Sequence, residues 1–205
     1  MSITDIFSFA GIAFSVLFPL INPIGGVPAF SGLTANDTPE FRLAQARKIS
    51  INVILILIVF LLIGKLLLEL FGLSLGVLQI AGGLIVANTG WAMVNAKTEK
   101  ESAGKVQNMD ISFMPMAMPI LSGPGAIGAV IGLSTGAKHP EDYIGFVIGI
   151  LGIGIVTYIF LYLSIPLMKK LGSGGINVLT RMMGFFILAI AVNLVYKGIV
   201  ELTKH

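Results

Sequence analysis

Two stretches of this chain place proline, glycine and a hydrogen-bonding side chain inside sequence that is otherwise apolar. The first, 18–34, reads FPLINPIGGVPAFSGLT and contains three prolines and three glycines. Proline lacks a backbone N–H and clashes with the preceding turn, so a helix entering this stretch is expected to break near Asn22 and Pro23. The helix can restart at once. Asparagine is a favoured N-cap, proline suits the first helical position, and Gly25 and Gly26 let a ligand approach the exposed amides.

The second stretch lies within 111–137 and repeats this chemistry. Ser122 or Gly123 can cap a new helix, Pro124 can take its first position, and Gly125 exposes the amide behind it. In lipid no water satisfies free backbone groups, so a broken helix survives only where it faces protein or a water-filled cavity. Both breaks therefore indicate a binding site.

Two helix starts of this kind suit a small zwitterion. Amides at a helix start attract a carboxylate, and Asn22 and Ser122 add side-chain hydrogen bonds. Neither broken helix contains Asp, Glu, Lys or Arg, so a charged substrate side chain would be unmatched. Glycine walls favour a small substrate, although glycine equally permits a bulky one. If the intervening segments are helical, the prolines also free carbonyls that can bind an ammonium group or a cation, namely those of Pro19, Ile24, Pro115 and Ile120.

A simpler explanation is that the prolines only kink two helices while the glycines let neighbouring helices pack. This explanation would suffice for a single motif, but two matching motifs in the two halves of the chain argue against it. Asn88 and Thr89 lie in the middle of the third apolar segment and are further candidates for substrate binding. The alternative for these two residues is hydrogen bonding between helices, which is the usual role of Asn and Thr in membrane spans.

Composition assigns the chain to the membrane. Of 205 residues, 56% are hydrophobic and 11% are charged, and the mean hydropathy is +0.96. No cysteine is present, and the histidines are only His139 and His205. We therefore expect no enzyme, no cofactor and no metal site. The basic residues form short clusters beside apolar segments, which argues against nucleic-acid binding. The first apolar segment follows Asp5 and is expected to be retained as a helix.

Uncharged windows long enough for a crossing, about 20 residues, predict six transmembrane helices in an all-α polytopic protein. Helices 1 and 4 are expected to break at the midplane. A turn at 72–76 precedes helix 3, and a loop at 169–177 separates helices 5 and 6. The predicted spans are 6–36, 49–64, 79–94 within the uncharged window 70–96, 111–137, 143–168, and 180 onward.

The chain is expected to form a single transmembrane domain, 1–205, built from two inverted repeats. Pro119 follows Pro19 at a spacing of one hundred residues, and three crossings per half require the second half to insert upside down. The repeats are 1–96 and 111–205, joined by a cytoplasmic connector at 97–110. Nine Lys and Arg residues lie on one side and four on the other, so the positive-inside rule places both termini outside.

The two proline–glycine motifs, the sequence IAGGLI in helix 3, and Gly175 with the segment 181–185 resemble the MarC family of integral inner-membrane proteins. The resemblance covers nearly the whole chain. It implies two inverted three-helix repeats and, as in the SnatA-type members, transport of small neutral amino acids such as glycine and alanine. It assigns the site to Asn22, Pro23, Gly25, Gly123, Pro124 and Gly125.

The expected function is therefore a secondary transporter with alternating access at a site between the broken helices. A channel lined by the same breaks, an exporter of other small solutes and a non-transporting assembly or sensor protein are the alternatives. The expected partners are a small neutral amino acid and the lipid bilayer. A coupling cation or proton and a homo-oligomer are compatible with the sequence, which does not determine the direction of transport.

Overall fold

The computed structural model describes residues 3–95 and 109–203, and every regular element in these two ranges is a helix. Most of the predicted connector 97–110 lies outside the described residues. The elements are α1 (Ile3–Ile21), α2 (Pro23–Leu33), α3 (Pro39–Phe71), α4 (Leu75–Val94), η1 (Ser112–Leu121), α5 (Pro124–Gly136), α6 (Pro140–Tyr162) and α7 (Ser164–Thr203).

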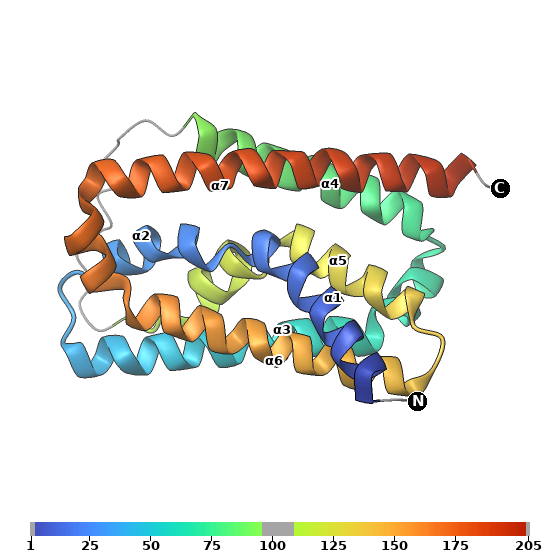
Figure 1. Cartoon of the computed structure of the whole chain (residues 1–205), viewed down its shortest axis with the longest axis horizontal. Coiled ribbons are helices and arrows are strands. Elements are labelled where there is room, and N and C mark those ends of the chain that lie inside the picture. Colours follow the sequence, from blue (N-terminus) through green and yellow to red (C-terminus); the bar gives the residue numbers. More distant parts are fainter. Residues whose placement is uncertain (1–2, 96–108, 204–205) are drawn as a thin grey trace.

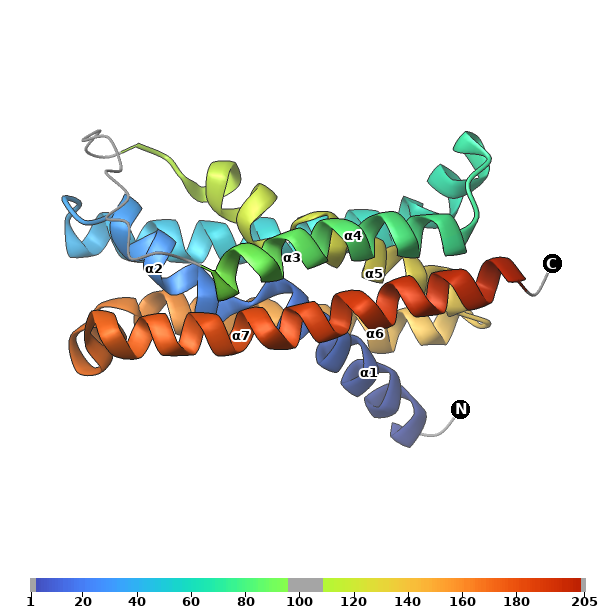
Figure 2. The ribbon, with the colours of Figure 1, turned by 90° about the horizontal axis from the view of Figure 1, so that it is seen from above.

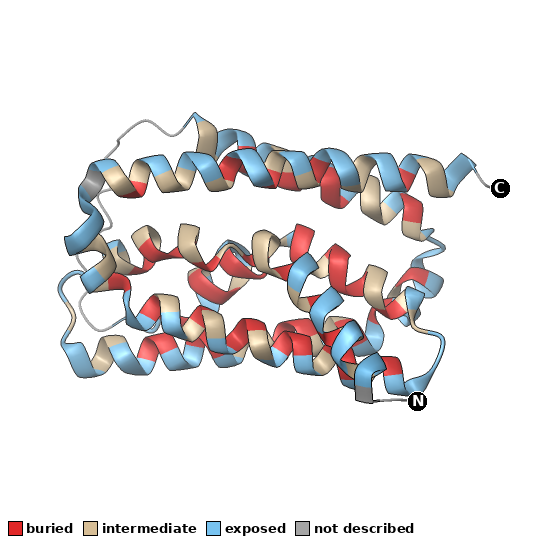
Figure 3. Ribbon diagram, viewed as in Figure 1, coloured by how far each residue is buried: buried red, intermediate tan, exposed pale blue. Residues whose placement is uncertain are grey.

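Within the described ranges, five helices are long and apolar enough to cross a bilayer, and six if η1 and α5 form one span bent by 70°. The prediction of an all-α polytopic membrane protein is confirmed. Exposed residues cover the outward faces of the helices (Figure 3), and many of the exposed side chains are large and apolar, as a lipid-facing surface requires.

Equivalent helices of the two halves run in opposite directions. α3 runs opposite to α6, α4 opposite to α7, and the pair α1–α2 opposite to η1–α5, so that both termini lie at the same end (Figure 1). The broken helix of each half packs against a long helix of the other half. Helices α1 and α2 pack on α6, and η1 and α5 pack on α3. Likewise α2 contacts α7, and α5 contacts α4. This is the arrangement of two inverted three-helix halves.

Helix α4 packs along most of its length against the second half of α7 (Figure 2). Gly76, Gly83 and Gly90 recur every seven residues on the contact face of α4. A Cβ atom at Gly90 would lie 2.9 Å from the carbonyl oxygen of Gly184, and one at Gly76 would lie 2.8 Å from that of Gly198. Small residues at these positions therefore let the two backbones approach directly.

The larger hydrophobic core lies among the other helices. Leu17, Phe30, Leu57, Leu121 and Ile150 are each fully buried in it and come from α1, α2, α3, η1 and α6. α4 and α7 contribute a separate small cluster of Val86, Ile187 and Ala191. The two broken helices contribute to this core and lie between the α3 and α6 helices on one side and the α4–α7 pair on the other (Figure 1).

Several predicted helix boundaries were wrong. Helix 2 was expected at 49–64, but α3 spans Pro39–Phe71. Its start is set by Thr38, whose hydroxyl accepts from the amide of Phe41 at 3.3 Å, and by proline at the first position. The expected turn at 72–76 is shorter, because Gly72 ends α3 at φ 64° and Ser74 caps α4. A charge-based window finds the apolar part of a helix and misses its polar ends.

Helices 5 and 6 also differ from the prediction. Helix 5 was expected to reach Met168, but α6 ends at Tyr162. The expected loop at 169–177 contracts to a kink at Gly172, where φ is 62°, and the last membrane-spanning segment begins at Gly174 instead of Thr180. The glycines that follow the kink are helical, because their low helix propensity is only a weak preference that packing overrides.

The first half of helix 4 is not an α-helix as expected. The segment η1 forms π-type turns, interrupted by extended backbone at Met114 and Met118. Each of these residues directly precedes a proline, Pro115 or Pro119, and the proline ring disfavours the helical conformation for the residue before it. The expectation that Pro119 frees the carbonyl of Pro115 required an α-helix here and therefore has no basis.

Candidate functional site

The two helix breaks face a shared cavity of about 600 Å³. Its walls come from the end of α1, the start of α2, the middle of α4, the end of η1, the start of α5, and α7. Seven of the ten predicted site residues line it: Asn22, Gly25, Gly26, Thr89, Gly123, Pro124 and Gly125. The other three, Pro23, Ser122 and Asn88, do not.

Asn22 forms the first break in a left-handed conformation, with φ 47° and ψ 62°. Its side-chain oxygen accepts a hydrogen bond from the amide of Gly25 at 3.0 Å, and its carbonyl accepts from the amide of Gly26 at 3.1 Å. The expectation that these two amides are free for a ligand is wrong, because Asn22 binds both. Its side-chain nitrogen donates to the sulfur of Met93 at 3.6 Å, a weak acceptor.

The second break lacks such a cap. The N-cap of α5 is Gly123, in an extended conformation with φ −72° and ψ 174°, and no side chain caps the helix. Gly123 corresponds to Asn22, since each directly precedes the proline at the first helical position. Of the two residues that the sequence offers as caps, Ser122 and Gly123, it is Gly123 that takes the N-cap position.

Ser122 is fully buried, and its hydroxyl has no hydrogen-bond partner among residues 3–95 and 109–203. Its own amide donates to the carbonyl of Ala117 at 2.7 Å. Pro23 is also buried, and its role is at the first position of α2. Both residues lie in the backbone at a break, and neither of them lines the cavity, whereas their neighbours do.

The glycines at the breaks are required by close contacts. A Cβ atom at Gly25 would overlap the side-chain nitrogen of Asn22, and one at Gly125 would overlap a methyl group of Val86. A Cβ atom at Gly26 would lie 2.9 Å from a methyl group of Leu121. Because these glycines have no Cβ atom, the backbone of α2 and α5 is in close contact with the side chains around the cavity.

One face of helix α4 forms one wall of the cavity. Ile85, Thr89 and Met93 are spaced by four residues, so they lie in a row along the helix. The Thr89 hydroxyl donates to the carbonyl of Ile85 at 3.2 Å, which leaves its oxygen able to accept. Asn88 is exposed and lies on another face of the helix, away from the cavity.

Sequence reasoning missed Met93, Thr180 and Ile187 as wall residues. The spacing of four from Thr89 was a usable signal for Met93. No local signal marks Thr180 and Ile187, since α7 reaches the cavity only through its packing on α4.

None of the residues that line the cavity is acidic, basic or histidine. Its polar groups are the Asn22 amide, the hydroxyls of Thr89 and Thr180, and backbone atoms at the two breaks. Across the part of the chain that the structure describes, no group of three acidic, histidine or cysteine residues could hold a metal ion. The site can therefore bind a ligand through hydrogen bonds and helix ends.

The fold and site define a polytopic membrane protein with a largely apolar cavity, which holds a few polar groups, between two broken, inverted helices. Sequence comparison agrees, because the model for the MarC family integral membrane proteins matches residues 7–203, and this chain belongs to that family. The expected resemblance is thereby confirmed.

The chain is similar along nearly its full length to curated relatives. It is 36% identical to the UPF0056 membrane protein YvbG of Bacillus subtilis, covering 94% of this chain and 95% of the relative. It is 33% identical to the UPF0056 inner membrane protein MarC of Citrobacter koseri, covering 98% of each. A UPF0056 membrane protein of Pyrococcus abyssi is 36% identical, with 89% of this chain and 90% of the relative covered. No solved structure matches the chain.

Proposed function

We propose that this protein is a secondary transporter of small neutral amino acids, with glycine and alanine as the reference substrates. The observation that carries the proposal is the uncharged cavity of about 600 Å³ between the two helix breaks. Its volume falls within the usual range for small-molecule sites, about 300–1,000 Å³. An inverted pair of broken helices around such a cavity is the architecture that secondary transporters use.

The two ends of a zwitterion find different partners in the cavity. The start of α5 has no capping side chain, so the first-turn amides of Gly125 and Ala126 are the donors proposed for the carboxylate. The hydroxyl oxygen of Thr89 and the side-chain oxygen of Asn22 are acceptors proposed for the ammonium group. A substrate side chain must be small or apolar, because no charged group could pair with it.

The proposal places the protein in the cytoplasmic membrane with both termini outside. Its basis is the excess of Lys and Arg near the start of α3 and the kink of α7. Relatives named as inner membrane proteins support the proposed location in the cytoplasmic membrane. A reporter fused to either terminus tests the proposed orientation. No catalytic step belongs to this proposal, and a coupling ion is left to experiment.

Transport is tested by the uptake of labelled glycine or alanine into proteoliposomes. Saturable uptake supports a transporter, whereas flux that rises linearly with concentration would indicate a channel, and absence of both flux and amino-acid binding would indicate a non-transporting role. Thr89→Val removes a hydroxyl from the cavity wall and is expected to lower uptake. Thr135→Val is the matched control, since the Thr135 hydroxyl also donates to a carbonyl of its own helix, that of Gly132 at 2.9 Å, and lies outside the cavity.

A further inference from the structure

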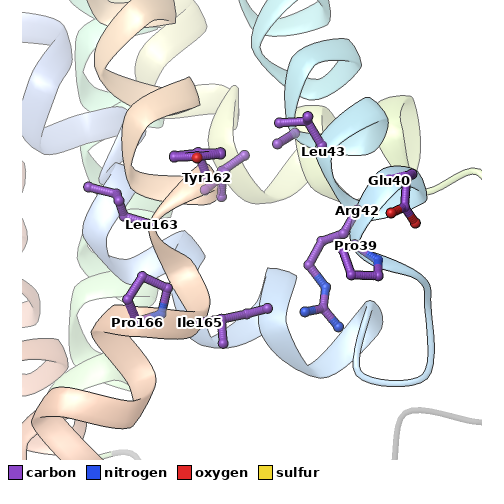
Figure 4. A pocket seen from close by; sticks show the side chains of 10 residues that line it. Pro39, Glu40, Arg42, Leu43, Tyr162, Leu163, Ile165 and Pro166 are labelled. Atoms are coloured by element: carbon purple, nitrogen blue, oxygen red, sulfur yellow. The ribbon is translucent and has the colours of Figure 1, made fainter.

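A second cavity, a groove of about 420 Å³, lies where α3 begins and α6 passes into α7 (Figure 4). It is separate from the cavity between the breaks and shares no residue with it. The groove lies at the end of the molecule that carries the excess of Lys and Arg. Its lining residues are Pro39, Glu40, Arg42, Leu43, Ala46, Leu161, Tyr162, Leu163, Ile165 and Pro166.

Arg42 contributes a positive charge to this groove, and no acidic side chain within 3–95 and 109–203 forms an ion pair with it. One terminal nitrogen of its guanidinium donates to the carbonyl of Thr34, an uncharged acceptor. Its Nε is buried and has no hydrogen-bond partner within the described ranges. Glu40 is exposed, and Figure 4 shows its carboxylate directed away from the α6–α7 residues. A buried donor without an acceptor costs free energy, so this guanidinium favours an anionic ligand.

Apart from Arg42, Glu40 and the hydroxyl of Tyr162, the side chains that line the groove are apolar. Leu43 and Leu163 are exposed on its two sides, from α3 and from the junction of α6 and α7. Tyr162 is 58% exposed and stacks on Tyr158 at a centroid distance of 6.1 Å. Tyrosine is typical of the level at which a bilayer meets water, because its ring is apolar and its hydroxyl is polar. The groove thus combines one cation with an apolar wall at the expected depth of lipid headgroups.

We propose that this groove binds an anionic phospholipid, with the phosphate on Arg42 and an acyl chain along the apolar wall. A guanidinium binds phosphate through two parallel hydrogen bonds, and Arg42 retains donors that Thr34 does not use. Exposed Lys169 and Lys170 follow on the first segment of α7 and add positive charge to the same end. Basic pockets between helices at the membrane surface are established sites for acidic lipid headgroups. The inference is independent of the proposed transport function.

The experiment measures the melting temperature of the purified protein in detergent, with phosphatidylglycerol, with phosphatidylcholine or with inorganic phosphate. A ligand bound only by the folded state raises the melting temperature. Phosphatidylglycerol is expected to stabilise the protein more than the other two additions do. Arg42→Gln is expected to weaken phosphatidylglycerol binding at least about tenfold, the usual effect of losing a charged hydrogen bond. Arg47→Gln, on the same helix and outside the groove, is expected to behave as wild type.

A second pair of variants keeps Arg42 intact, which matters because Arg42→Gln also removes the bond to Thr34. Ile165→Trp fills the groove, and Ile155→Trp adds the same ring on an exposed part of α6. Native mass spectrometry is expected to show phosphatidylglycerol lost from Ile165→Trp and retained by Ile155→Trp. The proposal is overturned if phosphatidylcholine or inorganic phosphate stabilises equally well. It is also overturned if Ile165→Trp retains the anionic lipid.

Discussion

Replacing Asn22 with alanine is the sharpest test of how the first break is built. The side-chain bond to the Gly25 amide, at 3.0 Å, is an N-cap interaction, and its loss costs about 1 kcal/mol. Asn22 also has φ 47°, a left-handed conformation that costs alanine roughly 1 kcal/mol more. The expected loss of about 2 kcal/mol corresponds to a fall of roughly 4–8 °C in melting temperature for a chain of this size.

Two further substitutions at Asn22 separate these contributions. Asn22→Gly loses the side-chain bond but adopts positive φ freely, so it is expected to cost about 1 kcal/mol less than Asn22→Ala. Asn22→Asp keeps the capping oxygen, loses the donor to Met93 and brings a charge into the uncharged cavity. We therefore expect Asn22→Asp to transport poorly while its cap persists. The intrinsic fluorescence of Trp91, the only tryptophan, reports melting.

The reasoning about the cap would be refuted if Asn22→Ala melted within about 1 °C of wild type, since the expected shift is several times larger. If Asn22→Gly were as unstable as Asn22→Ala, the left-handed backbone would not be the source of the cost. Each variant is compared with wild type in the same detergent and at the same lipid content, because bound lipid changes the apparent stability.

Three further predictions concern packing and charge. Gly125→Ala would overlap Val86 and is expected to reduce uptake at least about tenfold, with partial recovery when Val86 is also changed to alanine. Gly90→Ala would press on backbone of α7 and is expected to lower the melting temperature by about 2–10 °C, from an overpacking cost of about 1–3 kcal/mol. The hydrogen bond from Lys48 at 2.8 Å lowers the pKa of Asp110. The ion pair thus stabilises the fold above about pH 4, which is the pKa of Asp110 in the unfolded chain. This contribution is lost as the pH falls from there through the lowered pKa of Asp110 in the folded protein. Melting curves of wild type and Asp110→Asn at several pH values measure it.

The prediction for Gly90→Ala has a control in the chain. Gly11→Ala adds a methyl group where no atom lies within 4 Å, so it should leave the fold intact where Gly90→Ala does not. Equal melting temperatures for Gly90→Ala and wild type would show that α4 and α7 can separate without cost. The effect of Asp110→Asn should be small at neutral pH, because the side chains of Lys48 and Asp110 are 56% and 54% exposed.

The sequence identified both breaks because proline and glycine act locally. Pro23 and Pro124 each take the first position of a new helix, and this depends on little beyond their own neighbours. The preference against helix before proline agrees with the extended backbone at Met114 and Met118. It would not have singled out η1, because Phe18 and Val27 also precede prolines and are helical.

What sequence reasoning missed depends on packing between distant segments. Thr180 reaches the cavity only because α7 lies against α4 through glycines on both helices. The polar start of α3 is helical although it lies outside the apolar window, because a cap and a proline begin the helix ahead of the membrane. The sequence left the cap of α5 open between Ser122 and Gly123, because the two halves align at a spacing of one hundred residues at Pro19 and Pro119, but of one hundred and one at Asn22 and Gly123.

That extra residue makes the two helix starts chemically different. In the first half the residue before the proline is asparagine, and its side chain occupies the Gly25 amide that would otherwise attract an anion. In the second half the residue before the proline is glycine, which has no side chain to compete with a ligand. A symmetric pair of open helix starts would favour two anionic groups, whereas one capped and one open start distinguishes the two ends of a zwitterion. The difference between Asn22 and Gly123 is therefore what gives the proposed amino acid a single orientation between the two halves.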